Sequence, residues 1–539
     1  MADILIRNGL IIDGTGTSGF VGDIAVTKGR IESLGQKLVL DADKIINAQG
    51  KIVIPGLIDP HVHEEYVCLL DGKMELFMRQ GVTTCLSGNC GHSIFNAPVK
   101  EAIDYYWLNG LFSDMQREKY KKLFPDWEDF EGYAGYWNQR GCNVNMAVLQ
   151  GHGTIRWLVM GGALDRKPTA EEKKRIEAIL RRNMEQGAWG ISFGLSYVPS
   201  RYADTDELCE VVDIIKEYDG VAAAHLRHHI GMLPCTEEFI EVGRRTGARI
   251  QVSHLKPTCP ECFDAVKAAG EAGMRICADT IPASTGHLTR KDRMLQFIMA
   301  VSDTLFDKGV SGIKAALQTP EGRRTVLKDA YFFPADHSLT YIVNSEDPKL
   351  ENRSIADIAA ERCQEADETL LDLLADDKLY TFYLGGASRP DFPAAPHVPT
   401  IMNNPYISAG SDELMGDPDD MAGWYELQRR GAMPIFWHMY LKAGVPLEEI
   451  VRRNTSMLAH HLGIPKRGLL KPGYWADIAV IDLEKFRFPK PDEIDYHNPN
   501  TMASGVDAVL VNGVVTLEQG NLYEPLAGRL LLHGQDQQE

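Results

Sequence analysis

Short apolar runs alternate with amphipathic stretches through the middle of this chain, from about residue 55 to residue 460. The apolar runs include NVNMAVLQGHG, GAWGISFGL, GVAAAHLRHH, ARIQVSHLK and MRICADTIP. Between them lie helical patterns such as TAEEKKRIEAILRRNMEQG, in which Thr169 and Glu172 have the spacing of a capping box. Repeated strand-then-helix units predict a parallel sheet, and their number favours a closed barrel over an open sheet.

The two ends of the chain follow a different pattern. ADILIRNGLII near the start, and ADIAVIDLEKF and VDAVLVNGVVTLEQGNL near the end, are β-rich runs bounded by turn residues. We expect residues 1–56 and 464–539 to pair as one discontinuous β domain, with residues 57–463 as the catalytic body. Two unrelated small sheets are the alternative.

Residues 290–375 are less regular than the rest of the middle region. They contain the helical run GVSGIKAALQTPEGRRTVLKDA and the charged stretch EDPKLENRSIADIAAERCQEADE. We interpret this region as barrel helices plus an inserted cover, and we place a lid at about residues 287–375.

Composition excludes several classes of function. The chain has 539 residues, 44% of them hydrophobic, so it can bury a large core, and its formal net charge is −19. An acidic chain repels nucleic acid and anionic membrane surfaces. The sequence contains no apolar stretch of the ~20 residues that a membrane span needs, and its first residues lack a signal-peptide pattern. We therefore expect a soluble, cytoplasmic protein without nucleic-acid or membrane partners.

Residues with metal chemistry follow the apolar runs. His61 and His63 come after IVIPGLIDP, His225 ends GVAAAH, His254 ends RIQVSH and Asp412 ends YISAGSD. Residues i and i+2 of a strand point to the same face, so His61 and His63 can bind one metal ion. Active sites of barrels lie at the carboxyl ends of the strands, which predicts one shared site for these side chains.

The same positions carry a family resemblance. GLIDPHVHEEY resembles the first-strand signature of the amidohydrolase superfamily. A narrower likeness, to the N-acyl-D-amino-acid deacylases, rests on GVTTCLSGNCG, GHGTIRWLVMG, GISFGLSYVPSRYADTDEL, HLR, SHLK, SAGSD and PGYWADIAVID, which follow the family's order over nearly the whole chain. The resemblance implies a metal-dependent (β/α)8 TIM barrel with a small β-sandwich formed from both termini.

The resemblance also implies a ligand set. The tight zinc would take Cys90 of the GNCG motif, His225 and His254. A second, weaker metal position would take His61, His63 and Asp412, with Cys90 as a bridge. Zinc accepts thiolate well, whereas a cysteine considered alone is more often a buried apolar residue.

Other residues have roles that the resemblance suggests. Asp412 would be the general base, taking a proton from the attacking water and giving it to the departing nitrogen. Its alternative is a helix N-cap. Lys256 and Tyr197 would bind the substrate, with a solvated lysine and a packed aromatic as the alternatives. Arg227 and His152 would orient ligands.

Cys259 and Cys262 form a CPEC motif. A CxxC pair is typical of thiol redox sites and of zinc sites, but no second CxxC accompanies this one. A structural role is the more common alternative. The ten cysteines of the chain show no spacing framework of disulfides.

The sequence departs from the deacylase pattern where the substrate carboxylate is held. Ile281 and Ala283 stand in place of tyrosines, Glu413 follows Asp412, and Asp419 and Asp420 lie near where the family has a basic residue. Acids at these positions would repel an anionic substrate.

Three functions follow from these observations. We favour zinc-dependent deacylation of an N-acyl-D-amino acid to a carboxylate and a D-amino acid. A hydantoinase-like hydrolase of a cyclic amide, imide or ureide is the alternative, because part of the carboxylate clamp is missing. A non-catalytic scaffold is opposed by the six metal-type residues. The partner is a small-molecule amide, and the sequence leaves homo-oligomerisation open.

Overall fold

Eight parallel strands form a closed barrel at the centre of the protein. The computed structural model describes residues 1–255, 259–281, 286–291, 294–295, 303–330, 336–376, 378, 380–385, 403–414, 429–490, 493 and 501–535. Within these residues the barrel strands are β6 (Leu57–Asp59), β7 (Val82–Ser87), β8 (Asn145–Val148) with its continuation β9 (Gln150–Gly151), β10 (Gly190–Gly194), β11 (Val221–His225), β12 (Arg249–Val252), β13 (Ile276–Thr280) and β18 (Ile407–Ala409).

The barrel closes between its first and last strands. The backbone N–H of Asp412 donates to the carbonyl of His61 at 2.8 Å, and that of His63 donates to the carbonyl of Glu413 at 2.8 Å. These bonds join the chain after β18 to the chain after β6. The sequence's prediction of a (β/α)8 barrel is therefore confirmed.

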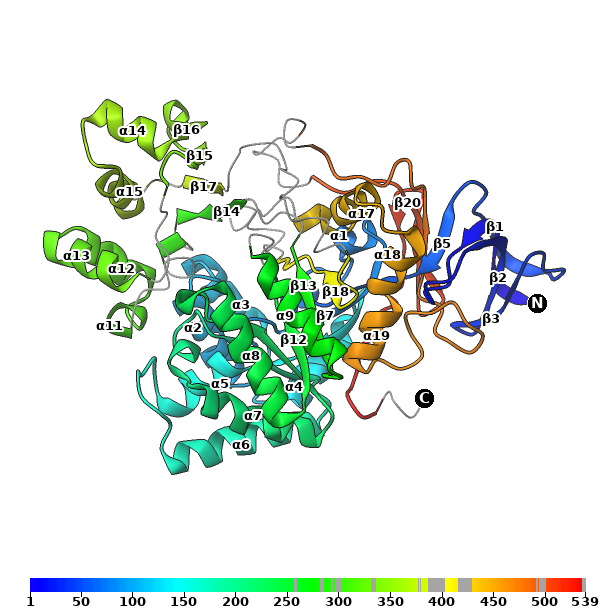
Figure 1. Ribbon diagram of the computed structural model, residues 1–539, viewed down its shortest axis with the longest axis horizontal. Coiled ribbons are helices and arrows are strands. Elements are labelled where there is room, and N and C mark those ends of the chain that lie inside the picture. The colour runs from blue at the N-terminus through cyan, green and yellow to red at the C-terminus, as the bar shows by residue number, and fades with distance from the viewer. Residues whose placement is uncertain are drawn as a thin grey trace.

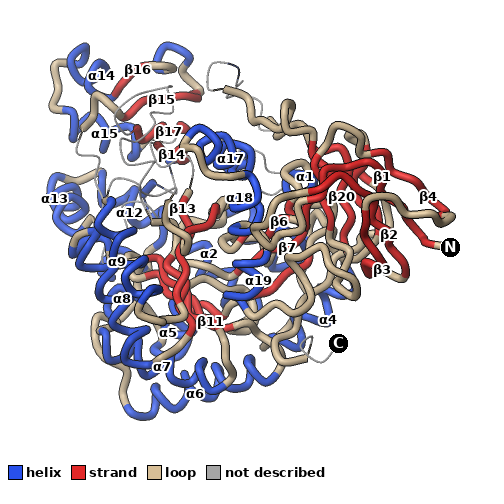
Figure 2. The backbone as a smooth tube through the Cα atoms, turned by 45° about the vertical axis from the view of Figure 1, so that its right-hand side comes forward, coloured by secondary structure: helices blue, strands red, loops and turns tan. Residues whose placement is uncertain are grey.

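Helices surround the barrel and are visible beneath and around it in Figures 1 and 2. They are α1 (Glu75–Met78), α2 (Val99–Leu108), α3 (Asp114–Leu123), α4 (Phe130–Arg140), α5 (His152–Met160), α6 (Ala170–Glu185), α7 (Thr205–Glu217), α8 (Met232–Thr246), α9 (Pro260–Glu271), α17 (Ala432–Lys442), α18 (Leu447–Arg453) and α19 (Ser456–Leu462). The predicted capping box begins α6: Glu172 N–H donates to Thr169 Oγ1, and Thr169 N–H donates to Glu172 Oε2.

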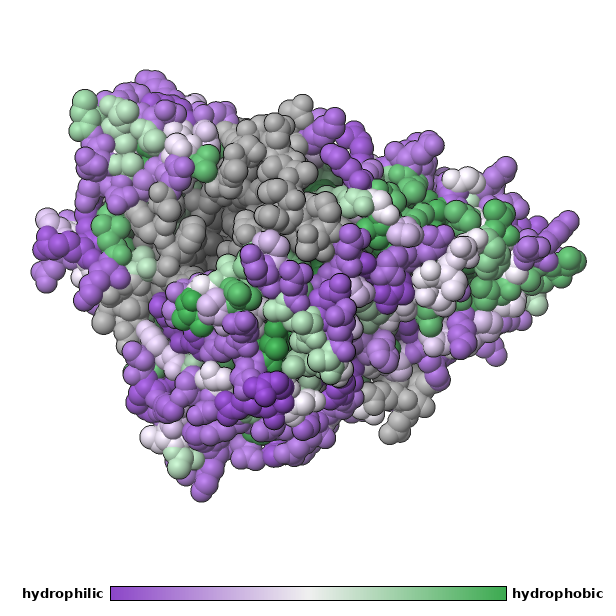
Figure 3. All heavy atoms as spheres, in the orientation of Figure 1, coloured by the Kyte–Doolittle hydropathy of each residue, from purple (hydrophilic) through white to green (hydrophobic). Residues whose placement is uncertain are grey.

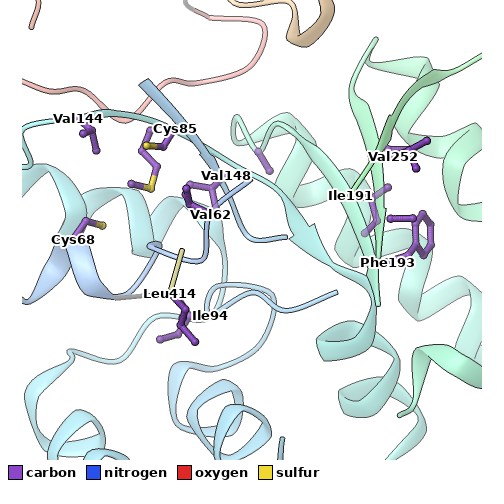
Figure 4. Packing of buried hydrophobic residues seen from close by; sticks show 14 of the residues in the cluster. Val62, Cys68, Cys85, Ile94, Val144, Val148, Ile191, Phe193, Val252 and Leu414 are labelled. Atoms are coloured by element: carbon purple, nitrogen blue, oxygen red, sulfur yellow. The ribbon is translucent and has the colours of Figure 1, made fainter. Parts of the chain in front are cut away.

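The core lies between the barrel strands and these helices. Strands such as β11 and β12 are buried at every position, as expected for parallel strands with both faces covered. Figure 4 shows Cys85 and Val148, on the neighbouring strands β7 and β8, near Val62, which follows β6, and it shows Ile191, Phe193 and Val252 gathered further round the barrel. This packing fixes the strand ends from which the candidate site is built.

Segments from both ends of the chain share one nine-stranded sheet. It contains β1 (Ala2–Ile11), β2 (Phe20–Thr27), β3 (Arg30–Gly35), β4 (Ala42–Asn47), β5 (Ile52–Pro55), β19 (Ile478–Ile481), β20 (Val506–Val511), β21 (Val514–Glu518) and β22 (Asn521–Leu522). The antiparallel pairing of β5 with β19 joins the N- and C-terminal pieces. In Figure 1 the blue and red strands accordingly lie side by side at the right.

A separate layer occupies part of the region expected to hold the lid. The strands β14 (Gly286–Arg290), β15 (Thr340–Ser345), β16 (Arg353–Ser354) and β17 (Tyr380–Gly385) form a four-stranded antiparallel sheet. With it lie α11 (Asp303–Phe306), α12 (Gly309–Leu317), α13 (Pro320–Asp329), α14 (Ile355–Arg362) and α15 (Ala366–Ala375). Ile313, Ile342, Leu370 and Phe382 belong to a core of their own here, so these helices pack with this sheet rather than around the barrel. Figure 2 shows the group at the upper left.

The surface over the barrel helices is mainly polar on the face that Figure 3 shows. In Figure 3 hydrophilic side chains cover most of the face over the outer barrel helices. Among the described residues, no helix combines the length and the hydropathy that a membrane crossing requires.

Candidate metal centre

Six side chains from the ends of five barrel strands converge at the carboxyl end of the barrel. The potential ligand atoms form two sets, and the atoms of each set lie within 4.8 Å of one another. The first set comes from His61, His63, Cys90 and Asp412, and the second from Cys90, His225 and His254. All except the partly exposed His63 are buried. The two sets share Cys90, so its sulfur stands between them.

The distances place Cys90 among three imidazoles. Its Sγ lies 3.4 Å from His61 Nε2 and 3.5 Å from His254 Nε2. It lies 3.9 Å from His225 Nδ1, and that nitrogen is 2.8 Å from His254 Nε2. On the other side, Asp412 Oδ1 lies 3.3 Å from His61 Nε2 and 3.1 Å from His63 Nε2. Ring nitrogens, a sulfur and a carboxylate oxygen thus point into one small volume.

The backbone holds three of these residues in an uncommon conformation. Cys90, His254 and Asp412 have positive φ angles of 54°, 34° and 52°. Left-handed conformations are disfavoured for residues with a Cβ, and they are concentrated at functional sites. Each of these residues lies just after a barrel strand, where the chain turns sharply and directs its side chain inward.

The two glycines of the GNCG motif lie so close to neighbouring backbone that a side chain would not fit there. A Cβ at Gly88 would lie 2.3 Å from the carbonyl oxygen of Leu149, and one at Gly91 would lie 2.6 Å from Gly194 N. Both glycines also have positive φ. The motif therefore lets the loop after β7 press against neighbouring strands and place Cys90 at the centre of the cluster.

Electrostatics favour an ionised thiol. Burial opposes the charged form, but His61, His225 and His254 together hold the pKa of Cys90 well below its usual value. Burial likewise opposes the charged form of His63, while hydrogen bonds to Asp412 and Cys90 raise its pKa to about 9. The cluster thus combines anionic donors with several imidazoles, and it suits a bound cation.

This donor set fits zinc. Thiolate, imidazole and carboxylate are the ligands that zinc takes in proteins, and three protein ligands leave a coordination position for a reactant. Hard cations such as magnesium and calcium prefer oxygen ligands, which are the minority here. The residues present therefore fit a zinc centre.

Two buried aspartates support the cluster, and sequence reasoning missed both. Asp279 Oδ1 accepts the backbone N–H of His254 at 2.8 Å and lies 3.3 Å from His61 Nδ1. Asp59 Oδ1 accepts the backbone N–H groups of His61 and Ser411. Burial raises the pKa of Asp59 to about 7. The available signals were an acid inside the apolar run MRICADT and the acid two residues before His61.

A third acid, also missed, holds the loop that carries Cys90. Glu65 Oε2 accepts Ser87 Oγ at 2.6 Å and the Gly88 N–H at 3.1 Å, and Tyr106 donates its hydroxyl to Glu65 Oε1. Glu65 is fully buried. It anchors the end of β7 directly before the GNCG turn.

The residues expected to bind substrate or to orient ligands lie in different surroundings. Tyr197 Oη lies 3.1 Å from His225 Nδ1, so its hydroxyl reaches the cluster. Arg227 donates to the carbonyls of Arg201 and Ala203 and pairs with Glu238, which fixes the loop after β11. Lys256 lies outside the described residues, as do Ala283, Asp419 and Asp420.

His152 has partners away from the candidate ligands. Its Nδ1 lies 2.9 Å from Ser200 Oγ and its Nε2 lies 3.4 Å from Glu207 Oε1. These contacts join the start of α5 to the 3₁₀ turn Ser200–Tyr202 and to α7. They suit packing between barrel helices better than ligand orientation.

Comparison with known proteins gives a consistent result. The family model described as "Amidohydrolase family" matches residues 44–231 and 345–517. The chain is 28% identical to a D-aminoacylase of Alcaligenes xylosoxydans xylosoxydans, over 98% of this chain and 97% of that protein. It is 27% identical to an N-acyl-D-aspartate deacylase of the same organism, over 95% of this chain and 91% of that protein.

A solved structure is similar over the same length. It is the N-acyl-D-glutamate deacylase of Bordetella bronchiseptica, complexed with zinc and a phosphonate inhibitor that mimics the tetrahedral intermediate. The TM-score is 0.74 and the identity 25%, over 98% of this chain and 99% of that one.

Proposed function

Because this chain belongs to the amidohydrolase family, we propose that it is a zinc-dependent enzyme that removes the acyl group from an N-acyl-D-amino acid. The products would be a carboxylate and a D-amino acid. The observation that carries the proposal is the position of Cys90 Sγ within 3.9 Å of His61, His225 and His254. The curated relatives named for deacylation of N-acyl-D-amino acids, similar over nearly the whole chain, supply the substrate class.

The ligands divide into two positions. Cys90, His225 and His254 would hold the tightly bound zinc, and His61, His63 and Asp412 would share Cys90 in a second, weaker position. Zinc, when bound, supplies Lewis acidity that polarises the scissile carbonyl and acidifies water. The chain's own contribution is to fix the ligands, to exclude solvent and to move the proton.

Asp412 has the position of a proton carrier. Its Oδ1 faces His61 and His63, and its backbone N–H is fixed by the carbonyl of His61. In the proposed reaction this carboxylate accepts a proton from the attacking water. It then delivers that proton to the amide nitrogen, which is a poor leaving group unless it is protonated.

Tyr197 would orient the substrate. Its hydroxyl is directed at the same nitrogen of His225 that faces Cys90, so it lies at the edge of the space where a carbonyl or carboxylate would bind. A phenolic O–H is a donor suited to either oxygen.

One observation favours the cyclic-amide alternative. Glu413, directly after Asp412, is buried, and its Oε1 lies 3.7 Å from Arg430 Nε. A buried acid beside Asp412 adds negative charge near the site and opposes an anionic substrate unless Arg430 compensates for it. A neutral hydantoin or dihydropyrimidine would avoid this repulsion.

A hydrolysis panel distinguishes the candidates. Purified enzyme is assayed on N-acetyl-D-methionine, N-acetyl-L-methionine, hydantoin and dihydrouracil, before and after treatment with dipicolinate, and again after zinc is restored. The proposal predicts turnover of the D-enantiomer that the chelator removes and zinc restores. Preferential hydrolysis of the cyclic amides establishes the alternative, and turnover unaffected by complete metal removal rejects both.

A further inference from the structure

The CPEC motif brings two thiols together at the start of α9. Cys262 Sγ lies 3.0 Å from Cys259 Sγ. Cys259 is the N-cap of the helix, Pro260 is its first residue and Cys262 lies within the first turn. Because α9 follows β12, this pair lies on the face of the barrel where the strands end, five residues beyond His254.

The two thiols differ in access to solvent. Cys259 is partly exposed, whereas Cys262 is fully buried. Burial raises the pKa of Cys262 to about 12, with Cys259 beside it. An exposed thiol with a buried neighbour is the arrangement in which one cysteine reacts with an external reagent and the other completes the exchange.

A second cysteine pair shows why exposure matters. Cys68 and Cys142 also interact through their side chains, but both are buried in the main core. No reagent in solvent reaches that pair without unfolding. Cys363, by contrast, is exposed, and its side chain is available as a single thiol control.

We propose that Cys259 and Cys262 are a reversible dithiol–disulfide site, oxidised by low-molecular-weight disulfides such as oxidised glutathione. The Cys259 thiolate attacks the external disulfide, forming a mixed disulfide and releasing one small thiol. Cys262, losing its proton, then attacks Cys259 Sγ and releases the second small thiol. The protein loses two protons and two electrons, and the external disulfide becomes two thiols. The inference is independent of the amide substrate.

A zinc site is the competing use of a CxxC pair, and the geometry does not favour it. Structural zinc takes four ligands, usually from two such pairs. Among the described residues, the side chains that could together hold a metal ion are the two sets at the carboxyl end of the barrel. Neither set includes Cys259 or Cys262. Cys235, which lies near them, donates to the carbonyl of Met232.

The test uses the folded, metal-loaded enzyme. Wild type, Cys259→Ser, Cys262→Ser and the control Cys363→Ser are incubated with oxidised glutathione, blocked with N-ethylmaleimide and analysed by peptide mass spectrometry. For wild type and the control, we expect loss of maleimide labelling at both cysteines, a peptide mass lower by two hydrogens, and reversal by dithiothreitol. For Cys262→Ser we expect a glutathione adduct that persists at Cys259.

Other outcomes overturn the proposal. Wild type that keeps both thiols free after oxidation, or that accumulates a lasting glutathione adduct at Cys259, contradicts closure of the disulfide. Circular dichroism of each variant verifies folding. If a serine variant fails to fold, the wild-type labelling pattern alone decides the result.

Discussion

Asp279 Oδ1 lies 3.3 Å from Nδ1 of His61, whose Nε2 on the other edge of the ring faces Cys90 and Asp412. Both side chains are fully buried. A carboxylate behind a ligand histidine fixes the ring's tautomer and orientation and makes the facing nitrogen a better donor. Asp279 also accepts the backbone N–H of His254, so one carboxylate steadies two candidate ligands.

Replacing Asp279 should therefore weaken metal binding without removing a ligand. We expect Asp279→Asn to lower zinc affinity about 10- to 100-fold, the usual effect of losing such a carboxylate. Competition with a fluorescent zinc chelator measures it. Asp219→Asn, which changes an acid that pairs with Arg249 and Arg275 at the amino ends of β11 and β12, is the control. Equal affinities for wild type and Asp279→Asn would reject the orienting role.

Replacing Asp412 should lower the rate of hydrolysis without releasing the tightly bound zinc. Asp412→Asn keeps the shape of the side chain but cannot carry the proton, so we expect kcat to fall about 10²- to 10⁴-fold. The tight zinc should remain, because Cys90, His225 and His254 are unchanged. Steady-state kinetics together with metal analysis measure both quantities. An enzyme that keeps its kcat shows that another group moves the proton.

Tyr197 should contribute to substrate binding through its hydroxyl alone. Tyr197→Phe removes one hydrogen bond worth about 1–2 kcal/mol, which corresponds to roughly a tenfold loss of kcat/KM. Zinc content should stay constant. Tyr218→Phe, which removes a hydroxyl bonded to Glu185 on an outer helix, is the matched control. A change in zinc content instead of kinetics would assign Tyr197 to the metal site.

The capping box of α6 gives a pH-dependent prediction for stability. Paired with Arg166, and accepting the N–H of Thr169, Glu172 has its pKa lowered from 4.5 to about 2. A lowered pKa in the folded state stabilises the protein above about pH 4.5, and this contribution is lost as the pH falls towards 2.

Glu172→Gln tests this effect, because glutamine keeps the cap but removes the charge. At neutral pH we expect the variant to be less stable by about 0.5 kcal/mol, as for other solvent-exposed ion pairs. Urea midpoints at pH 7, 5 and 3 should show the difference narrowing at the lowest pH. Glu171→Gln, at the neighbouring exposed position, should show no such trend. A difference that does not vary with pH would contradict the lowered pKa.

The positions of several candidate site residues at strand ends could be read from the sequence. His225 and His254 end apolar runs whose burial on both faces makes them barrel strands, and parallel strands end at one face. Their side chains had to lie near one another. Cys90 was found differently, from a motif whose glycines allow the tight backbone approach that places its sulfur.

The supporting acids could not be predicted in the same way. Asp279 and Asp59 occupy positions that pattern reading takes as polar strand or loop residues. Asp279 reaches His61 only through long-range packing, and Asp59, although two residues from His61, also accepts the N–H of the distant Ser411. The sheet of β14–β17 was missed for a similar reason. Its strands pair across up to about a hundred residues of intervening chain, which local periodicity does not report.

X-ray absorption at the zinc edge shows directly whether the Cys90 sulfur binds the metal. Wild-type enzyme and Cys90→Ser, each loaded with zinc, are compared, with Cys85→Ala, in the strand β7 that precedes Cys90, as the control. We expect sulfur scattering at about 2.3 Å from zinc in wild type and in the control, and none in Cys90→Ser. A wild-type spectrum with nitrogen and oxygen neighbours alone would contradict it.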